Sequence, residues 1–145
     1  MENSNFRKTL VLHNKLDELL KISSFLDELA DMWDLPFQLV LSLNLVLEEA
    51  FTNIVNYAYP DSGDHFIEIT FERDVNEVVI TLADDGIPYD PTLREDPDVT
   101  LPPEEREIGG LGIYLIKKMM DKVSYLRVSN RNLLTLSKTI GETDE

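Results

Sequence analysis

The stretch Leu47–Pro60, LEEAFTNIVNYAYP, decides how the rest of the chain is interpreted. If it is helical, Glu49, Asn53 and Asn56 lie on neighbouring turns, because residues three and four apart share one helix face. Apolar residues surround them almost without a break from Leu39 to Val55. A carboxylate and a carboxamide in such a helix are costly unless they are paired or used. Taken alone they are best interpreted as exposed or bonded to nearby backbone, and only the downstream motifs favour a functional role.

The composition indicates the class of protein. Its 145 residues suit one domain, and 43% hydrophobic with 28% charged residues is typical of a soluble globular protein. No apolar run reaches the ~20 residues of a membrane span. The N-terminal MENSNFRKTL lacks a secretory apolar segment, so we expect a cytoplasmic protein. The absence of cysteine excludes disulfides, thiol catalysis and Cys-ligated zinc, and His13 and His65 are predicted to be surface residues without metal-site spacing.

The formal charge of the chain is −15 at neutral pH. Such a chain would repel a phosphate backbone, so we expect no direct nucleic-acid binding. Partners with basic surfaces suit it better. If the chain binds a nucleotide, Mg²⁺, backbone N–H groups and a few local cations have to offset the phosphate charge.

Apolar periodicity predicts an α+β two-layer sandwich, with a mostly antiparallel sheet and helices on one face. One domain is expected over residues 1–145, with its core at about 6–140. Tyr59–Gly63 should end the second helix, and Asn130–Asn132 should be the turn of the last hairpin. The expected strands are Phe6–His13, Phe66–Arg73, Val78–Ala83, Tyr125–Val128 and Leu133–Lys138, and the expected helices are Lys15–Trp33, Pro36–Ala58 and one that opens at GGLGIYLIKKMMDKV.

Asp84–Ile108 differs from the rest of the chain. It holds five of the seven prolines, many acidic residues and few apolar ones. Irregular segments of this length in compact domains are usually functional lids or disordered.

Three polar clusters have complementary chemistry. The first is Glu49 with Asn53, the second is DDGIPYDP (84–91) at a strand end, and the third is GGLG (109–112) at a helix start. A glycine-rich helix N-terminus exposes N–H groups that suit phosphate, and a strand-end carboxylate can accept a hydrogen bond from an adenine amine. An Asn oxygen can join phosphate and water around Mg²⁺, and a Glu one turn away can act as a general base. Together these parts would suffice for phosphoryl transfer.

In this order the motifs resemble the ATP-binding domain shared by histidine kinases, gyrase-type ATPases and Hsp90-type chaperones, the GHKL superfamily with the Bergerat fold. The chain is most similar to the stand-alone bacterial branch, the anti-sigma factor serine/threonine kinases of the RsbW and SpoIIAB type. EEAFTNIVNYAY, DDGIPYDP, GGLGIYLIKKMMDKVSY and NRNLLTLSK carry this resemblance, which covers roughly Leu10 to Ile140. It implies a mixed, mostly antiparallel sheet covered on one face by three helices.

The resemblance also implies roles for individual residues. Glu49 would be the catalytic base, and Asn53 would bind Mg²⁺. Asp84 and Gly86 would bind adenine, Gly110 and Gly112 would contact phosphate, and about 92–108 would form an ATP lid. Thr135 would lie near the adenine site. The family often carries a cation just before the last glycine motif, but Ile108 and Gly109 stand there and the nearest cation is Arg106, which would have to take that role.

Three functions stay open from the sequence. The first, implied by the resemblance, is an ATP- and Mg²⁺-dependent anti-sigma factor kinase, a homodimer that phosphorylates an anti-anti-sigma (STAS-domain) partner and binds a sigma factor. The alternative is a nucleotide-gated regulatory module without phosphotransfer, favoured by the missing cation. The third is an interaction domain that has lost nucleotide binding, and the presence of Asn53, Asp84, Gly86, Gly110 and Gly112 argues against it.

Overall fold

The computed structural model describes residues 6–93 and 110–141. The strands are β1 (Arg7–His13), β2 (Phe66–Arg73), β3 (Glu77–Asp84), β4 (Lys122–Val128) and β5 (Arg131–Thr139). The helices are α1 (Leu19–Trp33), α2 (Phe37–Tyr57) and α3 (Gly110–Met119), with short 3₁₀ turns at Leu16–Glu18 and Pro91–Leu93. Every predicted element is therefore present, and its boundaries differ by only a few residues.

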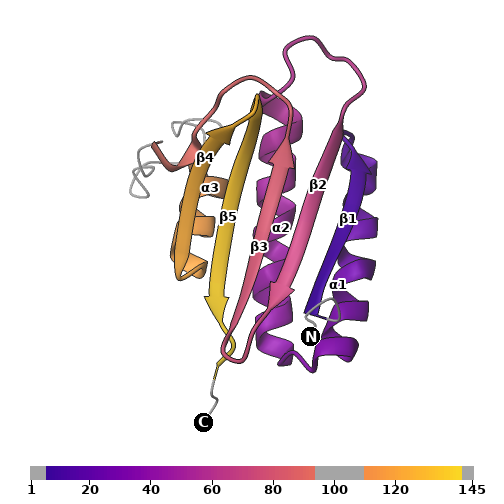
Figure 1. The fold of residues 1–145 in the computed structure, drawn as a ribbon, viewed down its shortest axis with the longest axis vertical. Coiled ribbons are helices and arrows are strands. Elements are labelled where there is room, and N and C mark those ends of the chain that lie inside the picture. Colours follow the sequence, from indigo (N-terminus) through magenta and orange to yellow (C-terminus); the bar gives the residue numbers. More distant parts are fainter. Residues whose placement is uncertain (1–5, 94–109, 142–145) are drawn as a thin grey trace.

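The strands form one five-stranded sheet in the order β1-β2-β3-β5-β4, and the three helices cover one of its faces (Figure 1). This arrangement confirms the α+β two-layer architecture of the Bergerat fold. Every pairing within the described residues is antiparallel, so the mixed sheet that we expected has no parallel pair there. The physical reason lies in the connections. Hairpins join β2 to β3 and β4 to β5, and two helices separate β1 from β2. Helix α3 separates β3 from β4, but β5 lies between these two strands and is antiparallel to both.

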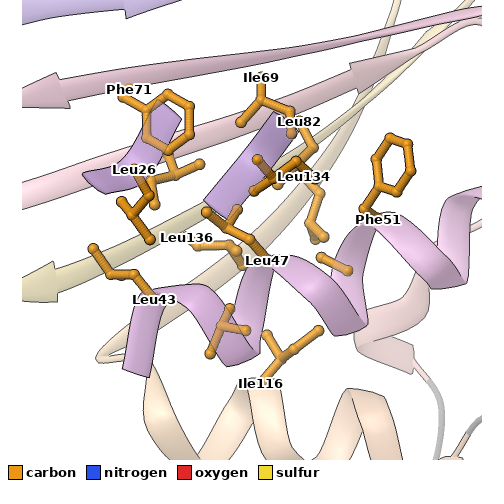
Figure 2. Packing of buried hydrophobic residues seen from close by; sticks show 14 of the residues in the cluster. Leu26, Leu43, Leu47, Phe51, Ile69, Phe71, Leu82, Ile116, Leu134 and Leu136 are labelled. Atoms are coloured by element: carbon orange, nitrogen blue, oxygen red, sulfur yellow. The ribbon is translucent and has the colours of Figure 1, made fainter. Parts of the chain in front are cut away.

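Helix α2 lies at the centre of the helical layer. Leu43, Leu47 and Phe51, which are spaced by four residues, are fully buried against the sheet (Figure 2). Leu82, Leu134 and Leu136 of the central strands meet them from the other side. Burying such side chains stabilises a fold by about 1.5–3 kcal/mol each relative to exposure.

By length and composition alone, helix α2 could cross a membrane. This differs from the expectation that no apolar segment is long enough to do so. Half of its most apolar window is buried within the protein. The core helix of a globular domain meets the same criteria, and the packing of α2 on the sheet accounts for its apolar character.

The last hairpin turns at a different place from the one predicted. Ser129 and Asn130 have positive φ values of 54° and 65°, which suit a two-residue hairpin loop. Arg131 and Asn132, expected in the turn, belong to β5 instead. Because side chains alternate between the two faces of a strand, this register places Asn132 on the helix-covered face with Leu134 and Leu136.

Candidate functional site

Glu49 lies halfway along α2 and faces the first turn of α3. A Cβ built on Gly112 would lie 2.6 Å from Glu49 Oε1, so the carboxylate fits against α3 because residue 112 has no side chain. Glu49 is half-buried, whereas its neighbour Glu48 is exposed. Burial, and after it the charge of Glu48, raises the pKa of Glu49 above its usual value. A carboxylate whose pKa is raised holds a proton more readily than a free glutamate does, which is the direction that a general base requires.

Asn53 follows Glu49 by one turn of α2 and is buried, whereas Asn56 is exposed. The structure therefore separates the three polar residues of this helix: Glu49 and Asn53 face the protein, and Asn56 faces solvent. Within residues 6–93 and 110–141, no group of three or more carboxylate or histidine side chains could hold a metal ion. A metal at Asn53 would need oxygens from a bound ligand and water, which is the usual situation for Mg²⁺.

Asp84 ends β3 on the helix-covered face and is 3% exposed. Its Oδ1 accepts hydrogen bonds from the Gly86 N–H and from Asn132 Nδ2, both at 2.8 Å. Burial raises the pKa of Asp84, and these two hydrogen bonds oppose that effect. Both bonds end on the same oxygen, so the other carboxylate oxygen is the one that a ligand amine would meet.

Gly86 brings the segment after β3 against the end of α2. Its missing side chain is required, because a Cβ would lie 2.3 Å from the carbonyl oxygen of Ala58 and 2.5 Å from the Ala58 Cβ. The Ile87 N–H donates to that same carbonyl at 2.9 Å. This contact holds the Asp84 strand end and the C-terminal end of the Glu49 helix together.

His65, which was predicted to be a surface residue without metal-site spacing, is partly buried, with 21% of its side chain exposed. Its ring stacks on Tyr59 with 4.3 Å between centroids, and each ring nitrogen lies 3.1 Å from a carboxylate oxygen, of Asp61 on one side and Asp85 on the other. The hydrogen bond to Asp61, and after it the bond to Asp85, raises the pKa of His65 against the effect of burial. His13 is exposed, as predicted.

The glycine motif opens α3, which begins at Gly110 as expected. Residues 94–109, which include Arg106 and most of the predicted lid, lie outside the described residues. The assignment of Arg106 and the extent of the lid therefore stay predictions.

Thr135 does not join the other predicted site residues, which corrects its assignment. It pairs with Thr81 across β3 and β5, and their hydroxyl oxygens are 3.4 Å apart. Because Asp84 and Asn132 lie on the helix-covered face, the two-residue period places Thr135 on the opposite face of the sheet.

Three residues that the sequence analysis did not assign form a hydrogen-bond network beside Asp84. Asn132 contacts it directly, and Asn132 Oδ1 accepts hydrogen bonds from the Tyr125 hydroxyl and from Arg127 at 3.1 Å. The signal that could have found Asn132 is its spacing of two and four residues from Leu134 and Leu136, which continues the buried side of the strand. The misplaced hairpin turn concealed it.

These residues fit a bound adenine nucleotide. Asp84 offers a buried acceptor, and α3 offers a helix start with glycine at positions 110 and 112. Glu49 and Asn53 lie on the neighbouring helix. Groups of these kinds can accept a hydrogen bond from an amine, bind phosphate, take up a proton and join the ligands of Mg²⁺.

Comparison with known proteins shows the family to which the chain belongs. The Histidine kinase-like ATPase domain family matches residues 12–138. Serine/threonine-protein kinase BtrW of Bordetella bronchiseptica is 33% identical over 109 residues, 75% of each chain. Serine-protein kinase RsbW of Oceanobacillus iheyensis is 30% identical over 126 residues, 82% of this chain and 77% of the relative. Serine-protein kinase RsbW of Bacillus cereus is 34% identical over 97 residues, which cover 63% of this chain and 59% of the relative. The resemblance found in the motifs is thus confirmed, and such a domain implies ATP binding.

Proposed function

Because this chain belongs to the histidine kinase-like ATPase domain family and is homologous to proteins named serine kinases, we propose that it is an ATP-dependent serine/threonine protein kinase that acts as an anti-sigma factor. Its substrate is a serine or threonine of an anti-anti-sigma partner with a STAS domain, and it also binds a sigma factor, as a homodimer in the cytoplasm. The observation that carries the proposal is the position of Glu49 against the glycine turn of α3.

Each residue has a separate task in this reaction. ATP supplies the phosphoryl group. Asp84 accepts a hydrogen bond from the adenine amine, the N–H groups at the start of α3 bind phosphate, and Asn53 contributes an oxygen to Mg²⁺. Glu49 takes the proton of the attacking hydroxyl as its oxygen bonds to phosphorus and ADP leaves. The raised pKa of Glu49 suits this role, because a base is most effective when its pKa is near the working pH.

A second candidate is a nucleotide-gated binding module without phosphotransfer. The sequence favours it at one point, because Ile108 and Gly109 stand where a cation would neutralise the terminal phosphate. In this case ATP binds and controls contact with a regulator, and no phosphate reaches the partner.

Titration calorimetry of Mg·ATP and Mg·ADP into the wild type, Asp84→Asn and Asp85→Asn tests the nucleotide site first. We expect binding by the wild type and by Asp85→Asn, since Asp85 is exposed, and loss of binding in Asp84→Asn. Incubation with labelled ATP and a STAS-domain partner then separates the candidates. A labelled partner supports the kinase, binding without label supports the gated module, and no binding by the wild type contradicts both.

A further inference from the structure

Asn132 uses the whole hydrogen-bonding capacity of its side chain. A carboxamide has two N–H donors and an oxygen that accepts two bonds. Nδ2 donates to Asp84 Oδ1 and to the Ile87 carbonyl oxygen, both at 2.8 Å. Oδ1 accepts from the Tyr125 hydroxyl and from the Arg127 guanidinium. Asn132 is only 5% exposed, so few of these bonds could be exchanged for water.

The neighbours of Asn132 permit only one orientation of this amide. Reversing it would aim the oxygen at the Asp84 carboxylate and the Ile87 carbonyl, which are both acceptors, and the amide N–H groups at the Arg127 guanidinium, which only donates. A buried network in which every member is satisfied is rigid, because each unmade bond would cost a full desolvation penalty.

The same network holds the chain that follows Asp84. Arg127 also donates to the Gly86 carbonyl oxygen at 2.8 Å, and the Tyr89 N–H donates to the Tyr125 hydroxyl at 3.3 Å. Residues of β4 and β5 therefore bind the strand end and the segment 86–89 at four points. The geometry of the Asp84 carboxylate depends on side chains about 40 to 50 residues away.

We propose that Asn132 is a positioning residue of the nucleotide site, which holds the Asp84 carboxylate in one orientation by donating to its Oδ1, and so sets the preference for adenine. This inference rests on the proposed ATP site and adds the residue that determines its base specificity. Tyr125 and Arg127 support Asn132 through its Oδ1, and the charge of Arg127 also acts directly on Asp84.

The charge of Asp84 matters because it decides which base is accepted. A charged carboxylate only accepts hydrogen bonds and therefore selects the amine of adenine, whereas a protonated carboxyl group can donate to the oxygen that guanine carries at that position. Burial raises the pKa of Asp84, and the Asn132 hydrogen bond is the largest of the effects that lower it. The Gly86 N–H and the charge of Arg127 also lower this pKa, and the charge of Asp85 raises it. Without Asn132, more of Asp84 is protonated at a given pH, so ATP affinity and discrimination against GTP both fall.

The experiment is a titration of Mg·ATP and Mg·GTP between pH 5.5 and 8.5 into the wild type, Asn132→Ala, Asn132→Ser and Tyr125→Phe. In Asn132→Ala we expect ATP affinity to fall about tenfold at the acidic end, the size of one lost hydrogen bond to a charged group. The difference in ATP affinity between Asn132→Ala and the wild type becomes smaller as the pH rises. The ratio of ATP affinity to GTP affinity is lower in Asn132→Ala than in the wild type. Asn132→Ser keeps one donor, so its ATP affinity should lie between those of Asn132→Ala and the wild type. Tyr125→Phe should lower ATP affinity too, but by less than Asn132→Ala does.

Two further measurements keep the outcomes distinct. The Asp84 carboxyl carbon, followed by NMR without nucleotide, should titrate at higher pH in Asn132→Ala, and Thr135→Val, on the opposite face, should leave it unchanged.

An equal loss of ATP affinity at every pH, with an unchanged ATP/GTP ratio, assigns Asn132 a purely structural role and overturns the inference, as does unchanged binding. Absence of ATP binding by the wild type overturns the proposed function and this inference with it. Folding of each variant is checked by its melting temperature, and Tyr125→Phe carries the test if Asn132→Ala does not fold.

Discussion

Glu49 and Gly112 are so close that a methyl group on Gly112 would lie 2.6 Å from Glu49 Oε1. The two residues belong to α2 and α3, which pack side by side in the helical layer (Figure 1). Gly112 therefore has a role beyond a flexible backbone, because it leaves room for the carboxylate of the proposed base.

Replacing Gly112 with Ala should move Glu49 without unfolding the protein. The atom that the new methyl group meets is the end of a flexible side chain, and Ala favours a helix more than Gly does, so stability should change by less than about 1 kcal/mol. We expect phosphotransfer to fall at least tenfold, because small displacements of catalytic groups are costly. A melting curve and a transfer assay check this, and unchanged transfer would show that the position of Glu49 is not critical.

Glu49→Gln should abolish phosphotransfer and retain ATP binding, because the amide keeps the shape and cannot take a proton. Glu48→Gln is the matched control, since Glu48 is the exposed neighbour. In the wild type the rate should rise with pH as Glu49 loses its proton, with a midpoint above the usual glutamate pKa because burial raises it. The pH profile of the transfer rate is the measurement, and a Glu49→Gln variant with wild-type rate would remove Glu49 as the base.

Gly86→Ala should destabilise the fold by about 1–3 kcal/mol, a usual cost of an overpacked site. The new methyl group would meet the backbone of Ala58 rather than a flexible side chain, so the junction between α2 and the segment after β3 must open. Chemical denaturation measures the change. Gly63→Ala is the control, because its new methyl group would come no closer than 3.3 Å, to the exposed carboxylate of Asp61, and we expect a change within about 0.5 kcal/mol.

His65→Phe should lower the melting temperature below neutral pH more than above it. The ring stack on Tyr59 is kept, and only the two contacts with Asp61 and Asp85 are lost. Because the pKa of His65 is raised in the folded state, its contribution is fully present below the unfolded value of about 6.5 and is lost as pH rises through the folded value.

Melting temperatures of the wild type and His65→Phe from pH 5.5 to 8.5 measure that contribution. In an Asp61→Asn/Asp85→Asn background the same substitution should no longer cost more stability at low pH, since the carboxylates are gone and the remaining effect, burial, lowers the pKa of His65. A difference between wild type and His65→Phe that stays constant over this range would assign the effect to packing.

The sequence by itself determined the elements and the local parts of the site. The four-residue spacing of Glu49 and Asn53 on α2 and the glycine start of α3 depend on neighbours within one or two turns, and local periodicity reveals them. The alternation in β2 and β3 likewise predicted the central hairpin.

Only the tertiary structure decided which distant side chains meet. A hairpin turn at Ser129 and Asn130, rather than over Asn130–Asn132, places Asn132 in β5 opposite Asp84 and Thr135 on the other face. The face on which a strand residue lies changes with every residue of register, and that register depends on pairing with β3, which lies about 50 residues earlier. The contact of Gly112 with Glu49 has the same origin, because it depends on how α3 packs on α2.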